Sequence, residues 1–269
     1  MTEEKVIRIQ DLKLYFTTNK GVVQAVDGVN FDLMPTKAVV VVGESGCGKT
    51  SLAKAVLRLL PRNAGEYSGQ VWLGDTETMA LSDEEYRKQI RWVQMSMVPQ
   101  AAMNSLNPVL RVGDQVAEPM LVHFGKSREE ALAQAAKMFQ NVGVPVDFLS
   151  RYPFELSGGM RQRVMIAMAL ACRPEILIAD EPTTALDVTI QAQILKLMNN
   201  LKKELNMAII FITHDLGVIN EMADDVVVMY SGEIVESASV KEIFDRDAKY
   251  SHPYTEGLLQ SIPSITTEK

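Results

Sequence analysis

Glycines, a lysine and a threonine gather at residues 43–50, which read Gly-Glu-Ser-Gly-Cys-Gly-Lys-Thr. Three glycines let successive backbone N–H groups converge on an anion, because no Cβ stands in the way. We expect Lys49 to reach β- and γ-phosphates, Thr50 to offer its hydroxyl to Mg²⁺, and Ser51 to lie near an α-phosphate. The segment predicts a phosphate-binding loop for a nucleoside triphosphate. Its predicted members are Gly43, Glu44, Ser45, Gly46, Cys47, Gly48, Lys49, Thr50 and Ser51.

The flanks of this loop fit that prediction. An apolar run at residues 38–42 enters it as a buried strand, and residues 51–60 have the pattern of a helix. The helix N-terminus adds a partial positive charge to the anion site. An incidental glycine-rich turn would have no need of a strand before it and a helix after it.

Two carboxylates end a second apolar strand at residues 176–179. Asp180 is expected to hold Mg²⁺ through its water shell, and Glu181 to orient or polarise the water that attacks the γ-phosphate. Two acids after a strand are also common as a solvated strand end. Beside a phosphate loop, the catalytic interpretation is favoured.

Composition places limits on the class of protein. Of 269 residues, 47% are hydrophobic and 23% are charged, which is ordinary for a globular protein. The net charge of −7 disfavours a nucleic-acid partner. Cys47 and Cys172 lie too far apart for a zinc motif, and they argue against a disulfide framework. The N-terminus lacks a secretory pattern, and no apolar run is long enough to cross a bilayer, so a cytoplasmic protein is expected.

The order of the predicted elements indicates an α/β fold with a mostly parallel core sheet. Short strand-like runs at 6–9, 22–26, 29–33 and 70–73 predict an antiparallel sheet around the loop. Capping boxes at Ser82 and Ser127 predict helices through about residues 90 and 141, so the middle of the chain should be helical. Strands at 176–179, 207–213 and 226–230 then alternate with a helix at 188–205. Ser231-Gly232 predicts a hairpin turn.

Leu156-Ser157-Gly158-Gly159-Met160 precedes a predicted helix that ends near Ala171. Six motifs resemble those of an ABC-type ATPase in kind and order: the phosphate loop, Gln100, Leu-Ser-Gly-Gly, Asp180-Glu181, Ala185-Leu186-Asp187 and His214. Ser105-Leu106-Asn107-Pro108, residues 179–193 and His252-Pro253-Tyr254-Thr255 further resemble the ATP-binding subunits of oligopeptide/dipeptide ABC importers. The resemblance covers nearly the whole chain.

The resemblance implies a P-loop NTPase fold with a RecA-like, mostly parallel core sheet, an antiparallel β subdomain and an inserted α-helical subdomain. The chain would form one ABC ATP-binding domain, 1–269, with core and β subdomain at about 1–100 and 158–269 and the helical subdomain at about 101–157. Ser157, Gly158 and Gly159 would close over ATP held by a second subunit, with Asp187 at the same interface. A head-to-tail dimer with two composite sites follows.

The resemblance also assigns roles to single residues. His214 would contact the γ-phosphate, although a lone histidine after a buried strand is more often structural. Gln100 would sense Mg²⁺ and the attacking water. Phe16, more than Tyr15, would stack on adenine after the first strand, and the alternative is a core aromatic residue. The implied cofactors are ATP and Mg²⁺.

The implied partners are a second ABC ATPase, usually a paralogue, two transmembrane permeases and, indirectly, an extracytoplasmic solute-binding protein. The chain would then lie at the cytoplasmic face of the cell membrane. Peptides are the expected solute, whereas oligosaccharides and metal chelates remain alternatives within the same branch. Two rivals belong to other classes: the ABC subunit of a soluble carbon–phosphorus lyase complex, and an ABC protein that acts on ribosomes or DNA. The second is disfavoured because the chain has one motif set and no long heptad run.

Overall fold

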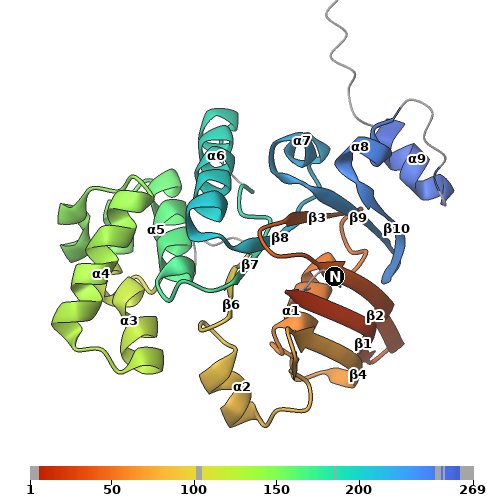
Figure 1. Ribbon diagram of the computed structural model, residues 1–269, viewed down its shortest axis with the longest axis horizontal. Helices are drawn as coiled ribbons and strands as arrows, with labels where there is room; N and C mark the ends of the chain where they lie inside the picture. Colours follow the sequence, from red (N-terminus) through yellow and green to blue (C-terminus); the bar gives the residue numbers. More distant parts are fainter. Residues whose placement is uncertain (1–5, 101–104, 185, 246–249, 251, 261–269) are drawn as a thin grey trace, which may run out of the picture.

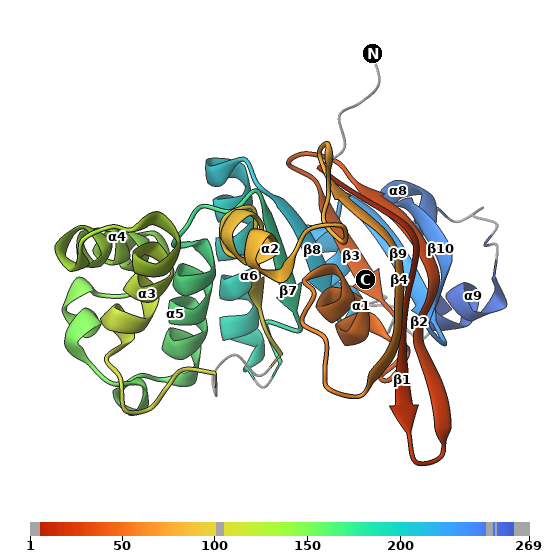
Figure 2. The ribbon, with the colours of Figure 1, turned by 90° about the horizontal axis from the view of Figure 1, so that it is seen from below.

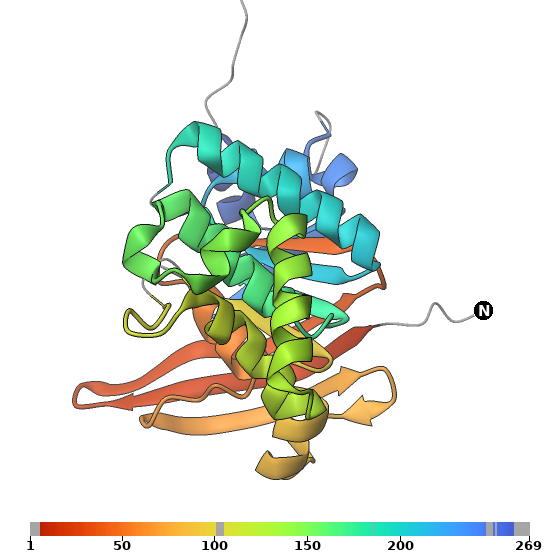
Figure 3. The ribbon, with the colours of Figure 1, turned by 90° about the vertical axis from the view of Figure 1, so that its left-hand side faces the viewer.

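The structure is a computed structural model that describes residues 6–100, 105–184, 186–245, 250 and 252–260. Two sheets lie side by side at one end of the molecule, and a group of helices forms the other end (Figures 1 and 2). Viewed from the helical end, α3 (Val112–Phe124), α4 (Arg128–Asn141), α5 (Gly158–Leu170) and α6 (Val188–Leu205) stand in front of the sheets (Figure 3).

Within the described ranges, the larger sheet has six strands in the order β10-β9-β3-β8-β7-β6. They are β3 (Ala38–Val42), β6 (Met95–Val98), β7 (Ile176–Asp180), β8 (Ala208–Ile212), β9 (Asp225–Tyr230) and β10 (Glu233–Ser239). All neighbours are parallel except β9 and β10, which Ser231-Gly232 connects. Every residue of β3, β7 and β8 is buried, as in parallel strands covered on both faces. The predicted mostly parallel core sheet is confirmed.

In the same part of the chain, the smaller sheet is antiparallel, with the order β2-β1-β4-β5. Its strands are β1 (Ile7–Thr18), β2 (Gly21–Leu33), β4 (Ala64–Leu73) and β5 (Thr76–Glu77). The runs predicted as separate strands at 22–26 and 29–33 belong to one long strand, because irregular pairing with β1 carries the ladder past the polar residues between them. The helix α1 (Lys49–Val56) contributes Leu52 and Val56 to an apolar cluster with both sheets.

Helix ends follow local capping chemistry. Ser82 caps α2 (Asp83–Gln89) and Ser127 caps α4, each in the predicted capping box with a glutamate three residues on. The helix predicted at 51–60 is wrong at both ends: α1 starts at Lys49 and stops at Val56, because Arg58 adopts a positive φ of 51°. The guanidinium of Arg58 donates to the carbonyl of Leu81, which holds the chain in that turn.

The helices α3, α4 and α5 share one apolar core with the larger sheet. Met120 of α3, Phe139 of α4 and Ile166 of α5 belong to the same buried cluster as Val40 of β3 and Phe211 of β8. Short helical turns at Val146–Ser150 and Pro153–Glu155 link α4 to α5. Since this core is continuous, it does not separate the helices from the sheet, and the helical subdomain of about 101–157 stays a prediction. Residues 101–104 lie outside the described ones.

The C-terminal third completes the outer layer. The turn Leu216–Val218 and α7 (Ile219–Met222) follow β8, and α8 (Val240–Ile243) and α9 (Pro253–Gln260) follow β10 at the edge of the molecule (Figure 1). Among the described residues, every helix is too short or too polar to span a membrane.

Candidate active site

The phosphate loop, residues 43–50, turns tightly between β3 and α1. Gly43, Gly46 and Gly48 have φ values of 151°, 88° and 109°, which L side chains rarely adopt. A Cβ on Gly43 would lie 2.3 Å from the carbonyl oxygen of Met229, and one on Gly48 would lie 2.1 Å from that of Ala25. Gly48 is also the N-cap of α1 and supplies no capping side chain. The loop therefore needs its glycines, and the first N–H groups of α1 stay available to an anion.

Lys49 is folded into this loop. The residue is 5% exposed. Its Nζ donates to the carbonyl oxygens of Gly43 at 2.7 Å and Glu44 at 2.8 Å, and it lies 3.7 Å from Sγ of Cys47. Backbone carbonyls thus satisfy a buried ammonium in the way that phosphate oxygens would.

A cavity of about 580 Å³ opens beside the loop. Residues of the β1–β2 hairpin, the phosphate loop and three further segments line it: Phe16, Val23, Gln24, Ala25, Ser45, Gly46, Cys47, Gly48, Lys49, Thr50, Ser51, Gln100, Glu181, Ser231 and Gly232. Of the predicted loop residues, Gly43 and Glu44 lie at the base of the loop and do not line the cavity. A phosphate cradle with an aromatic side chain on its wall suits a nucleotide.

Phe16 reaches this cavity and Tyr15 does not. Both lie within β1, not after it as predicted, so they point to opposite faces of the sheet. The hydroxyl of Tyr15 donates to Asp27 at 2.5 Å, and that hydrogen bond raises the pKa of Tyr15 to about 12. Val23, directly opposite Phe16 across the ladder, lines the same cavity.

Thr50 and Asp180 bring two oxygen groups together. The Thr50 hydroxyl donates to Asp180 Oδ1 at 3.2 Å, and Asp180 is fully buried. Burial raises the pKa of this carboxyl. Among the described residues, Asp180 Oδ2 has no hydrogen-bond partner. A hydroxyl beside an unsatisfied buried carboxylate oxygen is the hard-oxygen chemistry that fits Mg²⁺.

Glu181 is the centre of a second cluster. Its Oε2 accepts hydrogen bonds from Gln100 Nε2 at 2.9 Å and from the Thr184 hydroxyl at 3.1 Å. Its Oε1 lies 2.9 Å from Nδ1 of His214. Partial burial works to raise the pKa of Glu181, but His214, Thr184 and Gln100 together lower it, so the carboxylate is ionised at neutral pH. The structure brings together the three residues predicted as catalytic, and it adds Thr184, which the sequence analysis missed.

The remaining predicted residues form a separate group. The Ser157 hydroxyl accepts the N–H of Met160 at 3.4 Å as the N-cap of α5, and Asp187 Oδ1 accepts the N–H of Ile190 at 3.0 Å as the N-cap of α6. A Cβ on Gly159 would lie 2.9 Å from the Ile190 side chain, so the two helix starts are in close contact. Within one chain, neither Ser157, Gly158, Gly159 nor Asp187 lines the cavity. The predicted Ala185 lies outside the described residues.

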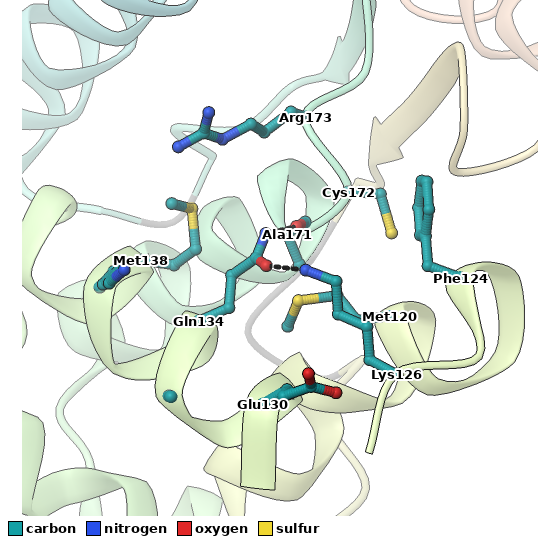
Figure 4. A pocket seen from close by; sticks show the side chains of 11 residues that line it. Met120, Phe124, Lys126, Glu130, Gln134, Met138, Ala171, Cys172 and Arg173 are labelled. Atoms are coloured by element: carbon teal, nitrogen blue, oxygen red, sulfur yellow. Dashed lines mark hydrogen bonds between the residues drawn. The ribbon is translucent and has the colours of Figure 1, made fainter. Parts of the chain in front are cut away.

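Another cavity, of about 570 Å³, lies between α3, α4 and the end of α5 (Figure 4). Part of its polar lining is internally paired: Gln134 donates to the carbonyl of Ala171 at 2.9 Å and accepts from Lys126. None of the predicted motif residues lines it. The predicted chemistry therefore belongs to the cavity at the phosphate loop.

Comparison with known proteins agrees with this geometry. The sequence pattern of the ABC transporter family matches residues 26–184, a segment that includes both the phosphate loop and Asp180-Glu181. The chain belongs to the ABC transporter family. Its fold is that of an ABC ATP-binding cassette, and the protein is an ATPase of this family.

Relatives and solved structures extend the match. The dipeptide transport ATP-binding protein of Bacillus subtilis is 47% identical over 97% of this chain and 78% of its own length. The glutathione import ATP-binding protein of Escherichia coli K12 is 46% identical over 98% of this chain, which spans 43% of that longer protein. A dimeric ATP-binding cassette in a post-hydrolysis state, bound to ADP and Pi, has a TM-score of 0.77 and 28% identity over 87% of this chain and 98% of that chain.

Proposed function

We propose that this chain is the ATP-hydrolysing subunit of an ABC importer that brings oligopeptides or dipeptides into the cell. The observation that carries the proposal is the meeting of the phosphate loop with Gln100 and Glu181 around one cavity. The solute class rests on the relatives, which are named for dipeptide transport and glutathione import. Peptides of a few residues are common to both names.

The residues at the cavity divide the work between binding and hydrolysis. Lys49 exchanges the loop carbonyls for phosphate oxygens, and Ser51 with the first N–H groups of α1 holds the remaining phosphates. Phe16 stacks on the adenine ring. ATP supplies the phosphoryl group that passes to water. Thr50, Asp180 and Gln100 would hold Mg²⁺, which would supply positive charge for the transfer.

Glu181 orients the attacking water and accepts its proton. Its lowered pKa keeps the carboxylate available as an acceptor at neutral pH. Gln100 and Thr184 fix one carboxylate oxygen, and His214 contacts the other. His214 is then free to exchange this contact for one with the γ-phosphate. Gln100 and Thr184 still hold the carboxylate when His214 leaves, so positioning a water costs little further conformational entropy.

The active form is a head-to-tail pair with a second ABC ATPase, a paralogue in this branch. Ser157, Gly158 and Gly159 support this arrangement because they lie outside their own chain's cavity yet present the N-terminus of α5, which suits phosphate. Asp187 also lies outside the cavity and would meet the other subunit. Solved cassettes with the same fold are dimeric. Each nucleotide would then be closed in by the phosphate loop of one subunit and the Ser157 loop of the other.

The ATPase pair acts on two transmembrane permease subunits at the cytoplasmic face of the cell membrane, and an extracytoplasmic binding protein delivers the solute. ATP binding closes the pair, and hydrolysis reopens it. The helical part between Gln100 and Ser157 receives the cytoplasmic helices of the permeases.

Partner identification tests this function. The tagged chain is isolated from detergent-solubilised membranes of its native cell, and copurifying proteins are identified by mass spectrometry. We expect two multi-spanning permeases and a second ABC ATPase, with an accompanying binding protein that retains peptides. Recovery in the soluble fraction with phosphonate-metabolising enzymes would contradict the proposal and favour the carbon–phosphorus lyase assembly. A binding protein that retains sugars or metal chelates would overturn the solute class alone.

A further inference from the structure

The segment His252-Pro253-Tyr254-Thr255 has no part in the chemistry described above, yet it reaches the phosphate loop. Tyr254 lies in the first turn of α9, and its hydroxyl oxygen accepts the backbone N–H of Glu44 at 2.8 Å. The two residues are 210 positions apart in the chain. A side chain near the C-terminal end of the described chain therefore holds the backbone at the start of the phosphate loop.

Tyr254 is itself fixed against the larger sheet. Its ring centroid lies 4.6 Å from that of Tyr230 at the end of β9, with the planes tilted by 42°. Its backbone N–H donates to His252 Nδ1 at 3.1 Å. Thr255, the next residue, is fully buried. The hydroxyl of Tyr254 is thus presented from a packed aromatic cluster, since offset and tilted aromatic pairs hold each other in place.

The peptide group between Gly43 and Glu44 is held from both of its sides. Lys49 Nζ donates to the carbonyl oxygen of Gly43 at 2.7 Å, and Tyr254 accepts from the N–H of Glu44 at 2.8 Å. Because a peptide group is planar, fixing either side fixes the orientation of the whole unit. When Lys49 turns to phosphate, its hold on Gly43 is lost, whereas the hydrogen bond to Tyr254 lies outside the cavity and persists.

We propose that Tyr254 is a positioning residue for ATP binding: its hydroxyl keeps the Gly43–Glu44 peptide in the orientation that forms the phosphate cradle. The inference rests on ATP binding at this loop. A cradle made of backbone N–H groups binds strongly only when those groups are already arranged, because arranging them on binding costs affinity. The C-terminal helix thereby contributes to nucleotide affinity without touching the nucleotide.

The test compares Tyr254→Phe with Tyr250→Phe in the full-length chain. Both changes remove one hydroxyl from the C-terminal region, but that of Tyr250 donates to the carbonyl of Ile243 and makes no contact with the loop. Loss of one hydrogen bond between neutral groups predicts a rise of about five-fold in the Kd for ATP in Tyr254→Phe. Tyr250→Phe should bind as the unmodified chain does.

Two further readouts separate positioning from general stability. In the assembled complex, Tyr254→Phe should raise KM for ATP by about five-fold and leave kcat within about two-fold, because the hydroxyl lies away from the reacting atoms. Amide hydrogen exchange in residues 43–48 should accelerate in Tyr254→Phe and not in Tyr250→Phe. Unchanged Kd and KM in Tyr254→Phe would overturn the inference, as would equal weakening by both variants.

Lys49→Ala separates this inference from the proposed function. If Lys49→Ala abolishes ATP binding and Tyr254→Phe leaves it intact, the positioning role fails and the phosphate loop stands. If Lys49→Ala binds ATP normally, the assignment of the nucleotide site fails, and the positioning role fails with it.

Discussion

The phosphate loop before α1 and the Ser157 loop (residues 156–160) before α5 both place glycines at a helix N-terminus, yet their backbones differ. In the phosphate loop, Gly43, Gly46 and Gly48 take positive φ values and the helix starts without a capping side chain. In the Ser157 loop, Gly158 and Gly159 belong to the first turn of α5, and Ser157 caps it. The first loop lines a cavity, whereas the second forms a regular helix N-terminus that a side chain caps.

This difference supports the proposal that each chain supplies one half of a composite site. A cradle must surround phosphates, so its N–H groups converge and stay uncapped. In the proposed pair, the Ser157 loop meets the same phosphates from the other subunit. In the single chain, the Ser157 hydroxyl caps a free N–H group in the first turn of α5. Glu181 belongs with the phosphate loop because it lines the same cavity, whereas Ser157 and Asp187 do not line it.

Glu181→Gln gives the largest expected effect and tests the chemical side of this division. Turnover should fall by about 10³-fold, within the range for loss of a general base, while ATP affinity stays within about three-fold because the side chain keeps its size and one hydrogen-bonding oxygen. Phosphate release by the assembled complex and equilibrium ATP binding measure the two quantities. Glu175→Gln, at the exposed residue just before β7, is the matched control and should change neither. Normal turnover in Glu181→Gln would remove Glu181 from catalysis.

Lys49→Ala tests the binding side. Removal of the buried ammonium should weaken ATP binding by about 100-fold or more, since loss of one partner of a buried charge pair costs about 2–5 kcal/mol. Calorimetric titration of the chain with ATP measures the effect. Lys88→Ala, on the exposed face of α2 and paired with Glu84, should bind ATP normally. Normal affinity in Lys49→Ala would contradict the nucleotide site.

Ser157→Ala tests whether the second loop acts across an interface. We expect ATP binding by the isolated chain to stay unchanged, turnover of the assembled complex to fall by about ten-fold for one lost contact to a charged group, and the free energy of unfolding to fall by about 1 kcal/mol through the lost cap. Ser127→Ala removes the cap of α4 and so controls for stability. If Ser127→Ala lowers turnover equally, the effect of Ser157 is structural and the composite site loses its support.

Local chemistry made the loops predictable. Glycine spacing fixed the phosphate loop, serine–glutamate pairs fixed the starts of α2 and α4, and continuous apolar runs located β3, β7 and β8. Each of these signals lies within a few residues of the structure that it specifies. Apolar runs also placed Glu181 and His214 after buried strands, whereas Gln100 was found through the family resemblance; the structure joins all three.

The cavity-lining residues and the strand that the sequence did not reveal depend on contacts between residues far apart in the chain. Val23 and Gln24 line the cavity because the β1–β2 hairpin folds over the loop, and Gly232 lines it because its N–H donates to the carbonyl of Cys47 at 2.9 Å. Thr184 lacked a signal, since a pair of threonines after a proline is ordinary in a turn. β6 was missed because four residues, Met95–Val98, give too short a pattern, and parallel pairing with β7 stabilises it.

Modification of the two cysteines gives the smallest effect and compares the two cavities. Cys47 lies in the phosphate loop, whereas Cys172 lies just beyond the C-terminal end of α5 and lines the other cavity. Burial raises the pKa of Cys172 to about 11, so its thiolate is scarce at pH 8 and its alkylation should accelerate as the pH rises toward that value. Cys47 lines the nucleotide cavity and Cys172 does not. Saturating non-hydrolysable ATP analogue should therefore slow modification of Cys47 several-fold and leave that of Cys172 unchanged, measured by mass spectrometry in Cys172→Ala and Cys47→Ser variants. Equal protection of both thiols would mean that nucleotide tightens the whole fold rather than filling the cavity at the phosphate loop, and cysteine modification would then no longer locate the site.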